Sequence, residues 1–92
     1  MREATIEKAI CDYAKSKNFL VYKFTSPGHV GVPDRIFIAP NGKVIFMEVK
    51  GPGKKPTALQ MREISKLLDH GVAACWCDSV QIGMIQLDVF SK

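Results

Sequence analysis

The sequence lacks the features that would assign it to a membrane or zinc-binding class. No apolar run approaches the roughly eighteen residues of a membrane-spanning helix, and the N-terminus is a charged amphipathic pattern without the form of a signal peptide. Cysteine is scarce and odd in number: Cys11 stands alone, and Cys75 and Cys77 form a C-x-C pair with no second pair to complete a zinc site. We therefore expect a cytoplasmic protein whose three cysteines are reduced core residues.

The chain also lacks repeats, low-complexity tracts and linkers long enough to divide it. With 92 residues, 47% of them apolar, it has the length and composition of one small domain, residues 1–92. No recognition helix or array of stacking aromatics is visible, so base-specific readout of nucleic acid is not predicted. Thirteen basic residues against nine acidic ones give a net charge of +4, which suits a polyanionic partner without requiring one.

Apolar spacing and turn residues predict the order of secondary structure. Helical spacing predicts a helix over 3–16, β-branched and aromatic residues predict a strand over 19–24, and two more strands follow at 35–39 and 43–50. A helix begins at Thr57 with the capping-box spacing to Gln60, and a buried strand, parallel to its neighbour, covers 72–77. Residues 79–92 fit either a helix weakened by glycine or an edge strand. We expect an α/β fold with an αβββαβ core, a mixed β-sheet flanked by helices.

The turn inside "GVPDRIFIAPNGKVIFMEVKG" determines which side chains of the hairpin share a face. With a two-residue Asn-Gly loop, Asp34 would lie opposite Val49 and point away from Glu48. With a three-residue Pro-Asn-Gly loop, Asp34 lies directly opposite Glu48. Proline prefers the first central position of a type I turn, and glycine supplies the left-handed residue of the closing bulge, so the sequence favours the three-residue loop.

This register gathers charge at one end of an otherwise apolar face. That face carries Asp34, Ile36, Ile38, Val44, Phe46, Glu48 and Lys50. The other face carries Phe37, Ile45, Met47 and Val49 and is also apolar, so we expect both faces of these strands to be covered.

The charged end of the hairpin has two interpretations. Two facing carboxylates near a core repel each other unless a positive charge neutralises them. Lys50 could supply that charge in a structural ion-pair cluster with Asp34 and Glu48. Alternatively, the carboxylates bind a hard divalent cation such as Mg²⁺, and Lys50 orients or deprotonates an attacking water while the cation stabilises charge on a phosphate oxygen.

The same residues resemble a known family. Pro33-Asp34, followed after thirteen residues by Glu48-Val49-Lys50, resembles the motif of the PD-(D/E)XK nuclease superfamily, and the αβββαβ order resembles its restriction-endonuclease-like core. The stretch "KFTSPGHVGVPDRIFIAPNGKVIFMEVKGPGKKPTALQ", with "EATIEKAI" before it and "LLDHG" after it, looks like the VRR-NUC domain. This resemblance runs from about Glu3 to Gly71, and stand-alone bacterial and phage members are similar in organisation to Holliday junction resolvases.

The resemblance implies roles for the hairpin residues. Asp34 and Glu48 match the family's metal-binding acids, with the backbone carbonyl of Val49 as a further ligand of Mg²⁺ or Mn²⁺, and Lys50 matches the catalytic lysine. It also implies a metal-dependent, structure-specific DNA endonuclease of a bacterial or phage-infected cell.

Two further site residues are implied outside the hairpin. The family's helix glutamate has two candidates, Glu3 and Glu7, which are four residues apart and share a helix face. We favour Glu7 as the catalytic and metal-binding residue because it precedes Ile10 as the family pattern requires and borders the buried stripe. Gln60 matches the family's glutamine after the basic loop, and this match is compatible with its place in the capping box.

Basic residues outside the site form the expected nucleic-acid surface. If Glu7, Asp34 and Glu48 belong to the metal site, six acids remain against thirteen bases. The expected phosphate contacts are Lys54 and Lys55 in the glycine- and proline-rich loop and, as weaker candidates, Lys23, His29, Arg35 and Arg62.

The leading interpretation is a homodimeric Holliday junction resolvase acting on branched DNA, since symmetrical cutting needs a twofold pair of sites. The alternatives are a flap or nicking nuclease of a phage replication or repair complex, and a non-catalytic nucleic-acid-binding module.

Overall fold

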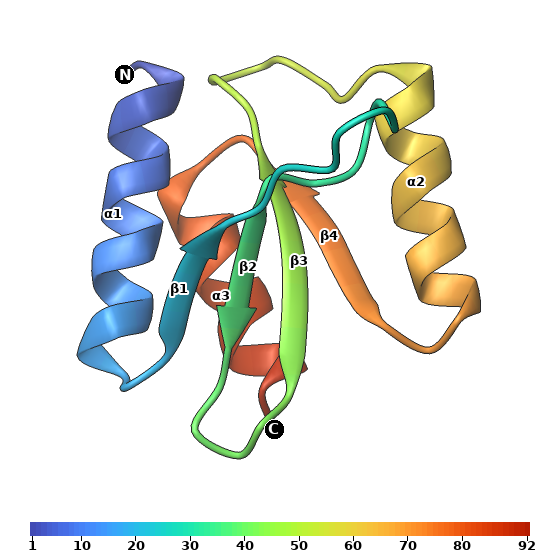
Figure 1. The fold of residues 1–92 in the computed structure, drawn as a ribbon. Helices are drawn as coiled ribbons and strands as arrows, with labels where there is room; N and C mark the ends of the chain where they lie inside the picture. The colour runs from blue at the N-terminus through green and yellow to red at the C-terminus, as the bar shows by residue number, and fades with distance from the viewer.

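Seven elements follow one another along the chain, and the computed structural model describes all of residues 1–92 (Figure 1). They are α1 (Glu3–Ser16), β1 (Leu20–Lys23), β2 (Arg35–Ile38), β3 (Val44–Val49), α2 (Ala58–Asp69), β4 (Ala73–Cys77) and α3 (Val80–Phe90). The strands form one mixed sheet in the order β1-β2-β3-β4, antiparallel except for the parallel pair β3 and β4. The predicted α/β fold with its αβββαβ order is confirmed, and none of the three helices is long and apolar enough to cross a bilayer.

The turn between β2 and β3 is the three-residue loop that the sequence favours. The amide of Ala39 donates to the carbonyl of Lys43 at 2.9 Å, and the amide of Gly42 donates to the carbonyl of Ala39 at 2.8 Å. Gly42 has φ +88, the left-handed conformation that glycine adopts without steric cost. The resulting register pairs Arg35 with Met47.

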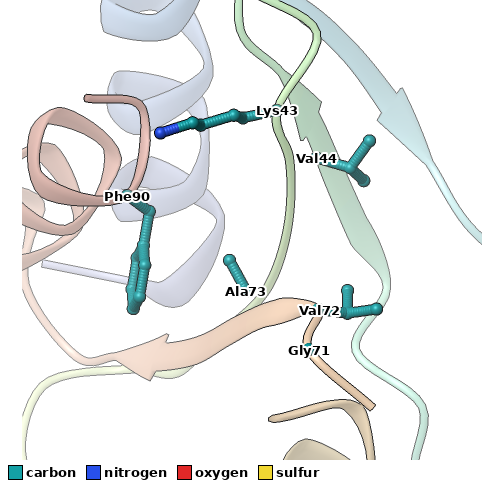
Figure 2. Close-up of a pocket in the computed structure, with 6 residues that line it drawn as sticks. All are labelled: Lys43, Val44, Gly71, Val72, Ala73 and Phe90. Carbon is teal, nitrogen blue, oxygen red and sulfur yellow. The ribbon is translucent and has the colours of Figure 1, made fainter.

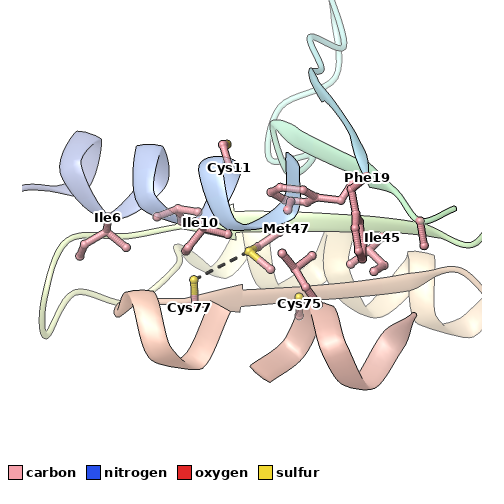
Figure 3. Close-up of a cluster of buried hydrophobic side chains, with 13 residues drawn as sticks. Ile6, Ile10, Cys11, Phe19, Ile45, Met47, Cys75 and Cys77 are labelled. Atoms are coloured by element: carbon pink, nitrogen blue, oxygen red, sulfur yellow. Dashed lines mark hydrogen bonds between the residues drawn. The ribbon is translucent and has the colours of Figure 1, made fainter. Parts of the chain in front are cut away.

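The core lies between the sheet and the layer formed by α1 and α3. Phe37, Ile45 and Met47 are fully buried on this face and pack with Ile6 and Ile10 of α1 (Figure 3). Burying one such side chain stabilises the fold by about 1.5–3 kcal/mol. All three cysteines are free and buried here, as predicted, and the Sγ of Cys77 lies 3.8 Å from the Sδ of Met47.

Residues 80–90 form a helix, which settles the ambiguity in the sequence. The hydroxyl of Ser79 accepts a hydrogen bond from the amide of Ile82 and caps α3. Gly83, which weakens the helical pattern, is required by packing, because a Cβ there would overlap the side chain of Ile10 and lie 3.2 Å from the Sγ of Cys77. The glycine therefore permits close contact between α3 and α1.

The opposite face of the sheet is only partly covered, and the expectation that both faces are covered is wrong. On this side α2 packs against β4, whereas β1, β2 and β3 are joined by a loop and a turn that supply no helix (Figure 1). Leu20 and Tyr22 are each 53% exposed and Val44 is 38% exposed. We call this surface the open face; its two cross-strand rows are Leu20–Ile38–Val44 and Tyr22–Ile36–Phe46.

Candidate functional site

The two hairpin carboxylates lie on neighbouring strands at one end of the open face. Asp34 directly precedes β2, and continuing the register beyond the pair Arg35 and Met47 places it opposite Glu48. The amide of Phe24 donates to the carbonyl of Asp34 at 2.7 Å, which fixes the backbone of Asp34 to the end of β1. The row Phe24–Asp34–Glu48 therefore follows directly after the apolar rows.

Glu48 is a buried carboxylate whose charge is only partly compensated. The residue is 8% exposed, and burial raises the pKa of its carboxyl, with the negative charge of Asp34 raising it further. Lys50 opposes these effects from 3.6 Å, measured between its Nζ and the Oε2 of Glu48, yet the pKa of Glu48 stays above its ordinary value. The ion pair between Lys50 and Glu48 is therefore present, and the choice between a structural ion-pair cluster and a metal site stays open.

The end of β3 is held by packing in the core and by hydrogen bonding to the end of β4. Val49 is buried in the core, and the amide of Lys50 donates to the carbonyl of Cys77 at 2.8 Å, which continues the pairing with β4. The side chains of Glu48 and Lys50 are both partly buried, with 11% and 17% of their surfaces exposed. The role of the Val49 carbonyl as a metal ligand stays a prediction.

The two helix glutamates, Glu3 and Glu7, lie in different surroundings. Glu7 forms an ion pair with Arg35, whose side chain lies on the core side of β2 facing α1. Glu3, one turn earlier, lies beside Gly51, and its negative charge contributes to the raised pKa of Glu48. The carboxylate of Glu7 is thus held by a counter-charge, and the choice between Glu3 and Glu7 as the site residue stays a prediction.

Gln60 takes part in the capping box that the sequence predicts. Its Oε1 accepts from the amide of Thr57 at 2.9 Å, and its own amide donates to the hydroxyl of Thr57 at 3.2 Å. The side chain is therefore turned toward the start of α2. A catalytic role for Gln60 stays a prediction.

The six candidate phosphate contacts fall into two groups. Lys23, Lys54, Lys55 and Arg62 are exposed and free of ion-pair partners. His29 and Arg35 already have carboxylate partners, Glu63 and Glu7, which makes them weaker candidates for phosphate. The loop that carries Lys54 is held at Gly53, whose amide donates to the Oδ2 of Asp78 at 3.2 Å.

Glu63 is the one buried charged residue besides Glu48, and the sequence analysis missed it. Its position three residues after Gln60 and next to buried Ile64 places it at the edge of the inward stripe of α2. Periodicity could have identified it, but its charged side chain argued against burial. Leu68, later on the same helix, is 49% exposed although it is apolar.

The cavities of the molecule lie away from the carboxylate pair. One, of about 360 Å³, opens at the other end of the sheet, between the start of β3, the start of β4 and the end of α3, where Figure 2 shows Lys43 and Phe90 around it. A second, of about 390 Å³, runs along α1 beside Glu7 and Arg35 and has mostly polar walls. The site at Asp34 and Glu48 thus lies outside both cavities, at a partly buried end of the sheet.

Comparisons with known proteins agree with this arrangement. The family model described as the VRR-NUC domain matches residues 3–81. Protein p44 of Acyrthosiphon pisum secondary endosymbiont phage 1, whose name describes it as an inferred nuclease, is 44% identical over 85 residues, 92% of this chain and 91% of p44. A solved VRR-NUC domain superposes with a TM-score of 0.86 at 26% identity over 94% of both chains. A solved VRR-NUC domain protein shares the fold, with a TM-score of 0.81 at 16% identity over 98% of this chain and 88% of its own.

Fold and comparisons together define the class as a nuclease domain built on the αβββαβ core. Within that class, the chain belongs to the VRR-NUC family.

Proposed function

We propose that this chain is an endonuclease that hydrolyses DNA phosphodiester bonds with Mg²⁺ or Mn²⁺ held at Asp34 and Glu48. The observation that carries the proposal is the charge balance at the sheet end. Two carboxylates, Asp34 and Glu48, lie together there with Lys50 as the one cation paired to them, so two negative charges face a single positive one. Because the chain belongs to a nuclease family, a divalent cation bound to this pair would assist hydrolysis of the phosphodiester bond.

The donor set suits a hard divalent cation. Mg²⁺ prefers oxygen ligands, keeps several waters and is commonly held by one or two carboxylates. Asp34 and Glu48 meet this need, with the Val49 carbonyl as a further ligand, although no group of three or more His, Cys, Asp or Glu residues converges anywhere in the molecule. When bound, such an ion neutralises phosphate charge and makes a coordinated water more acidic.

Lys50 supplies the second functional charge. Its ammonium is held beside Glu48 and is partly exposed, so it can reach both the carboxylate and a phosphate at the sheet end. We propose that it donates a hydrogen bond to the attacking water or to a non-bridging phosphate oxygen, where negative charge develops in the transition state. Glu48 keeps the ammonium in that position.

We further propose that the substrate is branched DNA, with the four-way junction as the preferred form. Four exposed basic residues, Lys23, Lys54, Lys55 and Arg62, are available for phosphates, and no element is shaped to read base edges. Recognition would then depend on the shape of the DNA backbone, which differs between a junction and a linear duplex.

Symmetrical cutting of a junction requires two copies, and we propose that they meet through the open face. Leu20 and Tyr22 there are half exposed, in a contiguous apolar surface of the kind that marks interaction sites. A standard interface takes about 800 Å² from each partner, roughly a seventh of the 5550 Å² of this chain. Val30, in the loop between β1 and β2, is 76% exposed and offers further apolar surface.

Sedimentation velocity tests the dimer. The wild type should sediment as a dimer at micromolar concentration, Tyr22→Glu should sediment as a monomer, and Leu68→Glu, an equally large change on an exposed site of α2, should stay dimeric. A monomeric wild type would remove the proposal.

Cleavage assays test the activity. Labelled four-way junction, flap and linear duplex are incubated with Mg²⁺, with Mn²⁺ and with chelator. Paired symmetrical nicks in the junction alone, absent in chelator and in Asp34→Asn, are expected. Cleavage that persists in chelator would refute the metal site. Preference for the flap would point to a flap nuclease, and binding without cleavage in every condition would identify a binding module.

A further inference from the structure

The loop of residues 25–33, which leads into Asp34, is fastened to α2 far from its own ends. It leaves the sheet at Phe24 and returns at Asp34, where the bond between the Phe24 amide and the Asp34 carbonyl closes its base. In between it crosses to the N-terminal half of α2 (Figure 1). Pro33, directly before Asp34, is fully buried. The backbone of Asp34 therefore depends on a loop held at several points.

The first fastening is backbone contact at Gly31. This residue has φ +97, and a Cβ there would lie 2.9 Å from the carbonyl oxygen of Leu59 and 3.0 Å from its carbon. Leu59 belongs to the first turn of α2. Only glycine allows both this conformation and this approach.

The second fastening is a side-chain cluster of His29, Glu63 and Lys66, which we call the loop clasp. The Oε1 of Glu63 lies 2.8 Å from the Nε2 of His29, and its Oε2 lies 2.9 Å from the Nζ of Lys66. Glu63 is buried although His29 and Lys66 are each about half exposed. Both oxygens of the Glu63 carboxylate therefore have a partner, and the contact of Oε1 with His29 connects the loop to α2.

We propose that Glu63 is a positioning residue of the nuclease site: through His29 it holds the 25–33 loop on α2 and so keeps Asp34 opposite Glu48. The inference rests on the proposed metal site at Asp34 and Glu48. It assigns His29 to the loop clasp instead of to phosphate binding. A buried carboxylate is costly unless it is paired, and here its pairing connects the helix to the loop that carries the metal-binding acid.

Amide hydrogen exchange tests the clasp without reference to activity. The Phe24 amide reports on Asp34 because it donates to that carbonyl. Glu63→Ala and His29→Ala should each accelerate its exchange at least tenfold, and His29→Gln, whose amide can still donate to Glu63, should restore most of the protection. Lys66→Ala is the matched control: it removes the partner on the other oxygen, does not touch the loop, and should leave the exchange unchanged.

Mn²⁺ titration of the metal-free full chain then tests the positioning role. Glu63→Ala and His29→Ala should each weaken Mn²⁺ binding by about tenfold, the size of effect seen when residues that orient metal ligands are removed. The double variant should be no weaker than either single variant, because both remove the same contact.

The outcomes separate this inference from the function on which it rests. A wild type that neither binds Mn²⁺ nor cleaves DNA would refute the metal site, and the positioning role with it. Normal wild-type binding with unchanged Phe24 exchange in Glu63→Ala would refute the clasp alone. Faster exchange with unchanged Mn²⁺ affinity would show a clasp that only stabilises the loop, and would overturn the positioning role.

Discussion

Asp34 faces Glu48 across the β2–β3 pair, and its negative charge adds to burial in raising the pKa of the Glu48 carboxyl. Lys50 offsets part of this repulsion and leaves the rest. If the proposed cation binds at this pair, stability and activity should respond in opposite directions when a carboxylate is removed.

Replacing Glu48 by glutamine should end cleavage and stabilise the metal-free protein. The pKa of Glu48 is raised in the folded state above its ordinary 4.5, so this group contributes stability below about pH 4.5 that is lost as pH rises through the folded pKa. Urea unfolding in chelator, from about pH 4 to about pH 7, should show the advantage of Glu48→Gln growing with pH. Asp69→Asn, at an exposed position on α2, is the control. A variant less stable than the wild type at neutral pH would contradict the assignment.

Loss of the Lys50 ammonium should reduce catalysis far more than DNA binding. Lys50→Ala should lower kcat by about 10²–10³-fold, the usual effect of removing a group that stabilises transition-state charge. Lys43→Ala, which changes a lysine at the opposite end of β3, should cleave normally. Single-turnover cleavage with saturating junction measures both variants. Comparable activity of Lys50→Ala and Lys43→Ala would exclude a catalytic role for Lys50.

The basic loop after β3 should contribute to affinity through phosphates. If Lys54 and Lys55 each contact one phosphate, replacing both by alanine should lower the slope of log K against log salt concentration by up to about 1.8, or 0.9 for each contact. Fluorescence anisotropy at several salt concentrations gives the slope. Lys17→Ala, at the far end of α1, should leave it unchanged. An equal change in both variants would show a general effect of net charge.

Gly83→Ala should destabilise the protein, against the usual preference of helices for alanine. In an exposed helix this substitution gains about 1 kcal/mol. Here the added methyl group would overlap Ile10 and press on Cys77, and overpacking of a core typically costs about 1–3 kcal/mol. Urea unfolding should therefore show a net loss. A gain in stability would mean that α1 and α3 can separate without cost.

The sequence predicted those parts of the structure that local chemistry decides. Proline and glycine around Asn41 favour one turn length, and this turn sets the register that brings Asp34 to Glu48. The capping box at Thr57 is likewise local. These features depend on residues that are close in sequence, so their prediction needed no knowledge of the remaining chain.

The features that the sequence did not predict depend on contacts between residues that are far apart along the chain. Glu3 and Glu7 share a helix face, and the ion pair between Glu7 and Arg35, 28 residues apart, is one of the long-range contacts that distinguish them. His29 and Glu63 are 34 residues apart, and nothing near either one in the sequence indicates their contact. The sequence did not predict the open face. Apolar residues on both sides of a strand show that either side can be buried, but they do not show whether another element covers it.

The turn at residues 40–42 limits the changes in chain length that this site can tolerate. It lies some six residues from Glu48, about 20 Å along an extended strand. A one-residue deletion there that shifts the pairing by one position would turn Glu48 or Asp34 to the other side of the sheet. Every atom of both carboxylates would still be present in such a chain, but they would no longer converge. The length of a distant turn is therefore as strict a requirement for this site as the identity of its acids.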